Sequence, residues 1–350
     1  MNFRNLNVLV LNWLLILAAP VDAAPKAKID FAVGGQAVIE GVMMRSPRSL
    51  TIAVRKPDKK IKVKKDHHLT ICQKYPKLNI PIVRGVINLF EMMIIGTKAI
   101  NWSANESIRD EEEHSDDSSP KINKQHALEK HEEESKSKLS KFYELLMFSL
   151  SLALAIGFSL FLFKFVPLGI TSLIDKNFST VHENFLFFNF IDGTLKATIF
   201  LTYIWLLSLI PSFRRVFEYH GAEHKSIFTY ENKLDLKVEN AKKQTRFHPR
   251  CGTSFIIIVF IISIFAYTLL PKQDTFIENF LLRVTFLPLV AGLSYEALKI
   301  SAKYSTSAFV KPLIAPGLAF QRLTTKEPKD GQLEVGLESL KAALEMEKQI

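Results

Sequence analysis

The stretch YELLMFSLSLALAIGFSLFLFKFVP, residues 143–167, is apolar over most of its length and nearly free of charge. An α-helix rises about 1.5 Å per residue, so a helix of this length can cross the roughly 30 Å hydrocarbon core of a bilayer. Three further apolar segments follow, at roughly 193–211, 253–270 and 281–298. The sequence therefore predicts a polytopic α-helical membrane protein with about four core transmembrane helices, in a membrane domain over residues 142–300.

Basic residues are concentrated in one connection between these segments. The loop between the second and third segments carries Arg214, Arg215, Lys225, Lys233, Lys237, Lys242, Lys243, Arg246 and Arg250. Each of the other two connections carries a single lysine, Lys176 or Lys272, and no arginine. The positive-inside rule then places the loop 211–252 in the cytoplasm. With four spans, the chain before residue 143 and after residue 298 is expected to be cytoplasmic as well.

The first 25 residues have features of a secretory signal. Arg4 precedes the apolar stretch LNVLVLNWLLILAAP (6–20), and small residues follow it. A cleaved signal would export the basic segment that comes next and would invert the topology that the charged loop indicates. We therefore interpret residues 1–25 as a hydrophobic N-terminal anchor or an extension, with a cleaved signal as the alternative.

Residues 31–104 are expected to form a small cytoplasmic β-rich unit that ends in an amphipathic helix. The stretch SLTIAVRKPDKKIKVKK (49–65) predicts two strands, near 50–55 and 60–64, around a Pro-Asp turn. Its many basic side chains form either a solvated hairpin face or a surface for anionic headgroups, with nucleic acid less favoured. A polar stripe between 80 and 102 predicts a helix that lies at the membrane interface or packs against membrane helices.

Two charged segments complete the chain. Residues 105–141 are dense in charge and contain no aromatic residue, so we expect a disordered linker that cannot form a core. The C-terminal tail, residues 301–350, has leucines on one helical face from about residue 330. This amphipathic helix is expected to dock on the cytoplasmic part of the protein.

The stretch HGAEH, residues 220–224, fits the H-x-x-E-H pattern of inverted zinc proteases. Side chains four residues apart on a helix lie roughly 5–6 Å apart at Cβ, so His220 and His224 can converge on one metal ion. Glu223 lies at the edge of the same face. It is a candidate ligand, a residue that orients a ligand, or a general base.

A second pair of candidate ligands, His248 and Cys251, occurs in the same loop. Pro249 disfavours helix at His248, so the pair is expected on a turn that leads into the third apolar segment. Together with His220 and His224 they form a nitrogen and sulfur set that suits Zn²⁺. Both pairs lie next to predicted membrane boundaries, which favours their coming together.

The sequence leaves the role of such a metal open. Four protein ligands favour a closed structural site, whereas three ligands leave a position for water and catalysis. A metal-free Cys251 nucleophile assisted by His248 is a third interpretation, and ordinary interfacial histidines are a fourth. Glu296, near the end of the fourth segment, is either functional or paired with Lys299 or Arg214.

The glycine pair near the N-terminus is a further candidate feature. Gly34 and Gly35 permit a tight turn or a close backbone approach. As a phosphate-binding loop the stretch is a poor match. Glu40, a few residues on, is considered as an added ligand of the metal.

Four stretches together resemble one known family. They are GGQAVIEGVMMR (34–45), YHGAEHKSI (219–227), HPRCGTSF (248–255) and PGLAFQRLTTKEP (316–328). They occur in order and resemble the YqhQ-like family of bacterial membrane proteins, a domain of unknown function, over about residues 31–345. The resemblance implies a multi-span protein of the bacterial inner membrane and a predicted metal-dependent enzyme.

Two classes of function follow from these observations. The first is a metal-dependent hydrolase, in which His220 and His224 hold zinc and Glu223 is the catalytic base. His248 or Cys251 would complete the metal site. The second is a non-enzymatic membrane scaffold or assembly factor, in which the metal fixes the loop. Its partners would be the lipid bilayer, anionic headgroups or another membrane protein.

A transporter is disfavoured. Lys196 and Arg283 are expected near the ends of their apolar segments, so the spans contain few central charges. The segments also show no evident inverted repeat.

Overall fold

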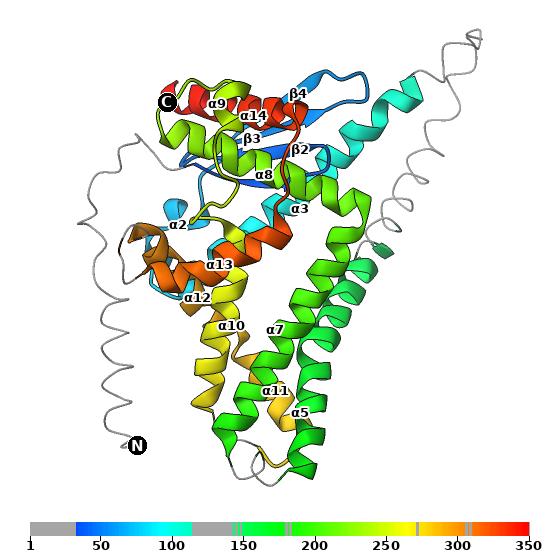
Figure 1. Ribbon diagram of the computed structural model, residues 1–350, viewed down its shortest axis with the longest axis vertical. Helices are drawn as coiled ribbons and strands as arrows, with labels where there is room; N and C mark the ends of the chain where they lie inside the picture. Colours follow the sequence, from blue (N-terminus) through cyan, green and yellow to red (C-terminus); the bar gives the residue numbers. More distant parts are fainter. Residues whose placement is uncertain are drawn as a thin grey trace, which may run out of the picture. The chain divides into compact units, whose positions relative to one another are not determined.

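The computed structural model describes residues 33–113, 149–178, 184–270, 273–304 and 310–349, with residues 143, 146, 147, 181 and 307 between them (Figure 1). The N-terminal segment 1–25 and most of the expected linker 105–141 lie outside the described residues. The chain divides into two compact units. The first contains residues 33–111, 202–267 and 284–349, and the second contains the described parts of 112–201 and 268–283. Both are mostly helical apart from one small sheet.

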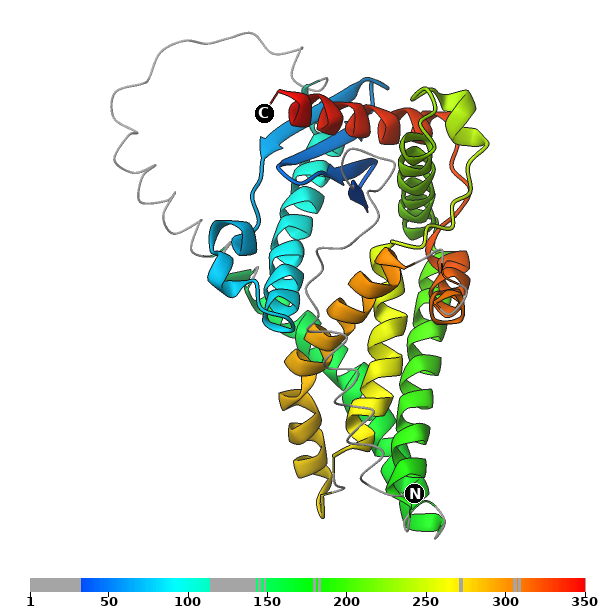
Figure 2. The same cartoon turned by 90° about the vertical axis from the view of Figure 1, so that its left-hand side faces the viewer.

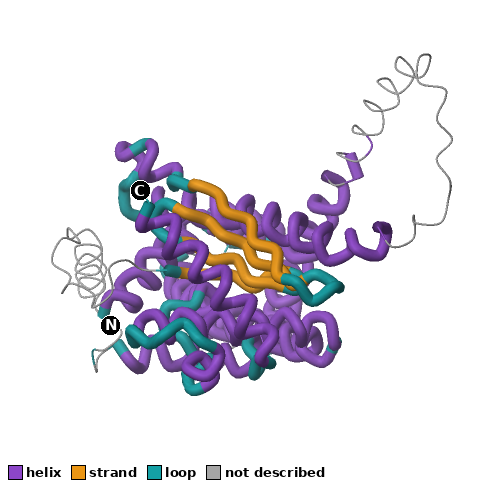
Figure 3. Tube along the Cα trace, turned by 90° about the horizontal axis from the view of Figure 1, so that it is seen from above, coloured by secondary structure: helices purple, strands orange, loops and turns teal. Residues whose placement is uncertain are grey.

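The sheet of the first unit is an antiparallel meander of four strands, drawn as adjacent orange tubes in Figure 3. Its strands, in the order β1-β2-β3-β4, are Gly34–Val38, Gly41–Arg45, Ser49–Arg55 and Ile61–His67. The two strands expected around the Pro-Asp turn are thus present as β3 and β4, and the glycine-pair stretch supplies the other two. Strand β4 lies at the sheet edge, and its partly buried Ile61 and Val63 alternate with exposed lysines because one of its faces packs on the core and the other faces solvent.

Helices cover both faces of this sheet (Figure 2). Helices α8, Pro211–Glu231, and α14, Asp330–Lys348, pack on the face that carries Met44. Helix α3, Val83–Glu113, packs on the face that carries Met43. Successive strand residues point to opposite faces, so both methionines are fully buried and β3 is buried along nearly its whole length. The C-terminal helix therefore docks on the sheet, as its leucine pattern predicts.

Helix α3 is longer than its sequence indicates. It continues to Glu113, so the first residues of the expected linker 105–141 are helical. Glu106 is buried, and its carboxylate accepts a hydrogen bond of 2.8 Å from Nζ of Lys62 on strand β4. One of the charges that predict disorder, that of Glu106, therefore has a partner on the sheet.

Two helical stretches are long and apolar enough to cross a membrane, Ser149–Asn177 and Leu186–Leu209. Phe276–Thr285 (α11) and Leu287–Lys303 (α12) together form a bent pair that would make a third span. The third expected segment is the shorter apolar helix α10, Gly252–Thr268. By length and composition, the described part of the chain thus supports two or three spans, whereas the sequence predicts about four.

The second unit contains buried charged side chains, two of which lie on helix α7, Phe185–Leu209. Lys196 and Arg283 both donate to the carboxylate of Asp192, and all three side chains are buried. Helix α7 begins at Phe185 and not near residue 193, so Lys196 lies well inside the helix. The expectation of few central charges is therefore wrong for this unit.

Two labelled elements, η2 Phe161–Phe165 and α5 Val166–Asn177, are parts of the stretch Ser149–Asn177. The remaining described helices are α2 Ile71–Lys74, η1 Pro76–Leu78, α9 Val238–Lys242 and α13 Lys311–Thr324.

The docking of α14 on the sheet can be tested by a cavity mutation. Leu340 is fully buried in the core that α8, α14 and the sheet share. We expect Leu340→Ala to lower the free energy of unfolding by about 2–5 kcal/mol, because it leaves a cavity in a packed core. Denaturant or thermal unfolding of the purified protein measures this. Glu338→Ala on the same helix is the control, and equal stability of the two variants would contradict the packing.

Candidate metal centre

Helix α8 carries both histidines and is held close to its neighbours by a glycine between them. Pro211 occupies the first turn of the helix, where its missing N–H costs nothing. A Cβ at Gly221 would lie 2.1 Å from the carbonyl oxygen of Lys326. Position 221 must therefore be glycine for the segment after α13 to pass this close to the helix.

Two backbone carbonyls fix the orientation of the imidazoles. Nδ1 of His220 lies 2.8 Å from the carbonyl oxygen of Thr324, and Nδ1 of His224 lies 2.5 Å from that of Arg246. A carbonyl only accepts, so both Nδ1 atoms must carry the proton. Each Nε2 then keeps its lone pair for a metal, the arrangement that metal-ligating histidines normally have.

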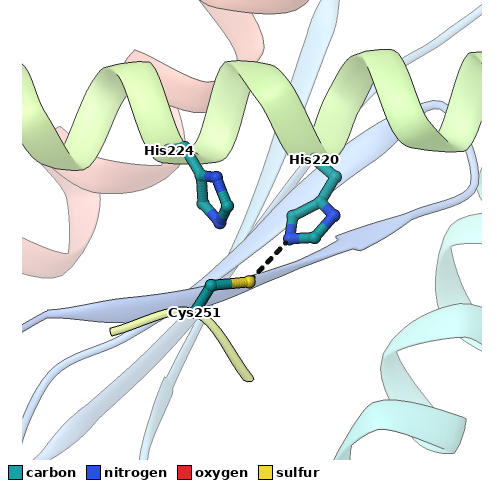
Figure 4. Close-up of side chains that lie close together, drawn as sticks. All are labelled: His220, His224 and Cys251. Atoms are coloured by element: carbon teal, nitrogen blue, oxygen red, sulfur yellow. Dashed lines mark hydrogen bonds between the residues drawn. The ribbon is translucent and has the colours of Figure 1, made fainter. Parts of the chain in front are cut away.

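Cys251 brings the third ligand atom from the turn before helix α10 (Figure 4). Its Sγ lies 3.2 Å from Nε2 of His220. One ligand atom from each of His220, His224 and Cys251 lies within 4.8 Å of the others, and all three residues are buried. In the described part of the chain, Nε2 of His224 has no hydrogen-bond partner. A metal ion would satisfy this buried atom, and the nitrogen and sulfur donors fit Zn²⁺.

Glu223 lies beside both metal-facing nitrogens. Its Oε2 is 3.7 Å from Nε2 of His220 and 3.6 Å from Nε2 of His224. Burial raises the pKa of Glu223, while the charges of His220 and His248 and a hydrogen bond from the backbone of Gly35 act in the opposite direction. A Cβ at Gly35 would lie 2.6 Å from Cγ of Glu223, so the glycine pair permits strand β1 to approach this carboxylate.

His248 is near this group but is not part of it. Its Nε2 lies 3.3 Å from a carboxylate oxygen of Glu231, and its Nδ1 accepts from the N–H of Arg250. The side chain of Gln321 makes two hydrogen bonds of 2.8 Å to the backbone of His248: its Oε1 accepts from the N–H, and its Nε2 donates to the carbonyl. The ring centroid of His248 is 5.6 Å from that of His224. Both ring nitrogens of His248 already have partners here. Its role as a ligand stays a prediction.

The other acidic candidates lie in different interactions. Glu40 has a positive φ of 52° at the β1–β2 turn and accepts from Arg215 and from the hydroxyl of Tyr219. Glu296 is buried and pairs with Arg84 of helix α3, with Nε to Oε1 at 2.7 Å. It therefore has an ion-pair partner, but not one of the two that were expected. Neither carboxylate belongs to the group formed by the two histidines and Cys251.

Sequence reasoning did not find the groups that position the ligands. The carbonyls of Thr324 and Arg246 have no signature in the side-chain pattern. Gln321 and Thr324 do belong to the stretch PGLAFQRLTTKEP, which carries part of the family resemblance. Two residues of that stretch thus contact His220 and His248.

Comparisons with known proteins give a family but no activity. A family model described as a protein of unknown function (DUF1385) matches residues 80–346. The uncharacterized protein YqhQ of Bacillus subtilis (strain 168) is 37% identical over 329 residues, which cover 92% of this chain and 95% of the relative. The chain therefore belongs to this YqhQ-like family. No solved structure matches it.

The ligand set predicts metal contents that differ between variants. We expect about one zinc ion per chain in the purified protein, and loss of most of it in His220→Ala, His224→Ala and Cys251→Ser, because each removes one donor of the group. Elemental analysis of each variant measures this.

His248→Ala is the matched control and should keep its zinc. A wild type without stoichiometric metal would contradict the assignment. Equal loss in His248→Ala would return His248 to the ligand set.

The buried, neutral His248 predicts a pH dependence of stability. Burial lowers the pKa of His248 to about 4, whereas the pKa of an exposed histidine is about 6.5. Below pH ~6.5 the unfolded chain takes up a proton that the folded chain resists. This contribution to stability is fully present above pH ~6.5 and falls by up to about 3 kcal/mol as the pH approaches 4.

Denaturant unfolding at several pH values measures the effect, with His248→Gln for comparison. The variant should lose stability less steeply between pH ~6.5 and ~4. Parallel curves for the two proteins would show that His248 is not buried in its neutral form.

Proposed function

We propose that this protein is a metal-dependent hydrolase of the membrane, in which Glu223 is the general base. The observation that carries the proposal is the placement of Glu223: its carboxylate is buried and faces the metal-directed nitrogens of His220 and His224. Those histidines and Cys251 make a three-residue donor set. Three protein ligands are the usual number in catalytic zinc sites, which keep one position for water.

In this proposal the metal, the residues that orient its ligands and the general base have separate roles. A zinc ion in such a site supplies a Lewis acid and a bound water that ionises near neutral pH. Thr324 and Arg246 hold the imidazoles in the required tautomer through their carbonyls. Glu223 receives a proton on its carboxylate, and burial shifts its pKa toward the neutral range where a general base is most effective.

A scaffold with a structural metal is the second candidate, and a specific observation favours it. Oε2 of Glu223 is almost equally far from both histidine nitrogens, so a small shift would make it a fourth ligand. A closed four-ligand site is typical of structural zinc. Such an ion would join helix α8 to the turn before α10.

We also propose that the metal centre lies at the cytoplasmic edge of a bacterial inner membrane. Helix α8 begins at Pro211, directly after the candidate span Leu186–Leu209. The loop that holds the ligands is the basic one, which supports a cytoplasmic position. The proposed partners are the lipid bilayer and its anionic headgroups, or another membrane protein.

The two candidates differ in what Glu223→Gln does. If Glu223 is the base, the variant should keep its zinc and lose hydrolysis by about 10²–10⁴-fold, because the amide cannot accept the proton. The measurement combines metal content with a screen of the purified wild type against ester, phosphoester and peptide substrates. Glu239→Gln, at an exposed position of helix α9, is the matched control.

The outcomes separate the proposals. Loss of zinc in Glu223→Gln would make Glu223 a ligand and support the structural metal. A variant that keeps both zinc and full hydrolysis would remove the base from the mechanism.

A further inference from the structure

Buried polar atoms without hydrogen-bond partners occur at a second place in the first unit. Among the described residues, Nε2 of His68, Oδ1 of Asn88 and Oε2 of Glu91 have none. Nε2 of His68 lies 3.3 Å from the other carboxylate oxygen of Glu91. Native proteins rarely leave such atoms unsatisfied, so each one needs an explanation. At the metal centre the explanation for His224 is an ion, and here a different occupant is required.

A pocket of about 310 Å³ is lined by Asn88, one of these three residues. Arg45 lines it from the end of strand β2, Cys72 from helix α2, Asn88 and Met92 from α3, and Tyr295 from α12. The side-chain amide of Asn88 donates to the hydroxyl of Tyr295 at 2.8 Å, which leaves the Tyr295 proton available to a ligand. The volume is at the small end of the range for ligand sites.

Arg45 gives this pocket its chemistry. Its Nη1 lies 2.6 Å from the sulfur of Met92, and a thioether is a weak acceptor. Burial lowers the pKa of Arg45, and the charge of Glu91 opposes that shift. A guanidinium with a thioether as hydrogen-bond partner is suited to bind a phosphate or carboxylate group with its free N–H donors. Arg45 also ends the stretch GGQAVIEGVMMR, which the metal centre uses only through Gly35.

The segments that line the pocket also expose large apolar side chains. These are Leu69, Ile71, Tyr75, Leu78, Ile80, Val83, Phe90, Met93 and Ile94. Apolar surface of this kind marks contact with a membrane or a partner. Helix α3 is joined here to α12 by the pair of Arg84 and Glu296, and α12 belongs to the bent pair that could make a third span. The pocket therefore lies next to a candidate membrane helix.

We propose that this pocket binds the phosphodiester headgroup of a membrane phospholipid, with its acyl chains against the exposed apolar side chains of residues 69–94. Arg45 and the hydroxyl of Tyr295 donate to the phosphate oxygens. The hydroxyl or ammonium group of the headgroup donates to Oδ1 of Asn88, an acceptor in the pocket lining that lacks a partner. The inference rests on the bilayer association within the proposed function, and it is independent of the metal.

The test uses the full-length protein in detergent and short-chain dihexanoyl phosphatidylglycerol as the probe. Binding is measured as a shift of the unfolding temperature during titration. Dihexanoylglycerol lacks the phosphate, while sn-glycerol 3-phosphate and inorganic phosphate lack the chains. We expect the phospholipid to bind and the other three compounds to bind at least tenfold more weakly, since each lacks one of the two contacts.

Arg45→Gln should weaken binding of the phospholipid by roughly 10- to 100-fold, because a charged hydrogen-bond donor is lost. Lys77→Gln is the matched control: it removes the same charge from an exposed position of η1 that does not line the pocket. Equal affinity of Arg45→Gln and wild type would overturn the proposal. Equal binding of inorganic phosphate would replace the lipid by a soluble anion, and equal binding of dihexanoylglycerol would leave an apolar surface without a phosphate site.

A second measurement needs no mutation and covers the case in which Arg45→Gln does not fold. The thiol of Cys72 lines the pocket, so bound phosphatidylglycerol should slow its modification by N-ethylmaleimide, as followed by peptide mass spectrometry. Modification at an unchanged rate would overturn the proposal. Zinc content and membrane fractionation of the same preparation report separately on the metal centre and on bilayer association.

Discussion

The close approach of helix α8 to backbone on two sides controls the candidate metal centre. On one side, Gly221 leaves room for the carbonyl of Lys326, and Thr324, the last residue of α13, presents its carbonyl to His220. On the other side, Gly35 leaves room for Glu223. A side chain at either glycine would push the helix away and change the positions of the nitrogens and the carboxylate. Packing and chemistry are therefore set by the same contacts.

This constraint explains why stretches far apart in the sequence act together. The glycine pair of β1, the HGAEH stretch of α8 and the turn at Cys251 each contribute one part of the centre. The carbonyls of Thr324, at the end of α13, and of Arg246 orient the two imidazoles. Buried atoms that lack partners identify where something else is needed. One such atom belongs to His224, and another, Oδ1 of Asn88, belongs to a residue that lines the pocket of Arg45.

The sequence predicts the parts of this structure that depend on local spacing. Histidines four apart, the alternation of β3 and β4, and the leucines of α14 each follow from the period of one element. The hydrogen-bond partners of His248 could not be predicted, because Glu231 and Gln321 reach it from separate elements. The extension of α3 was missed because the partner of Glu106 is a lysine on a distant strand. The early start of α7 was missed because one partner of Asp192, Arg283, comes from another helix and is not visible in the local sequence.

X-ray absorption spectroscopy at the zinc edge, on the purified full-length protein, tests the central claim most directly. The account predicts bound zinc with two histidine nitrogens at about 2.0–2.1 Å and one sulfur at about 2.3 Å. A fourth light atom would complete the shell. A zinc shell without sulfur, or protein that binds no zinc, would contradict the assignment of His220, His224 and Cys251 as the metal ligands.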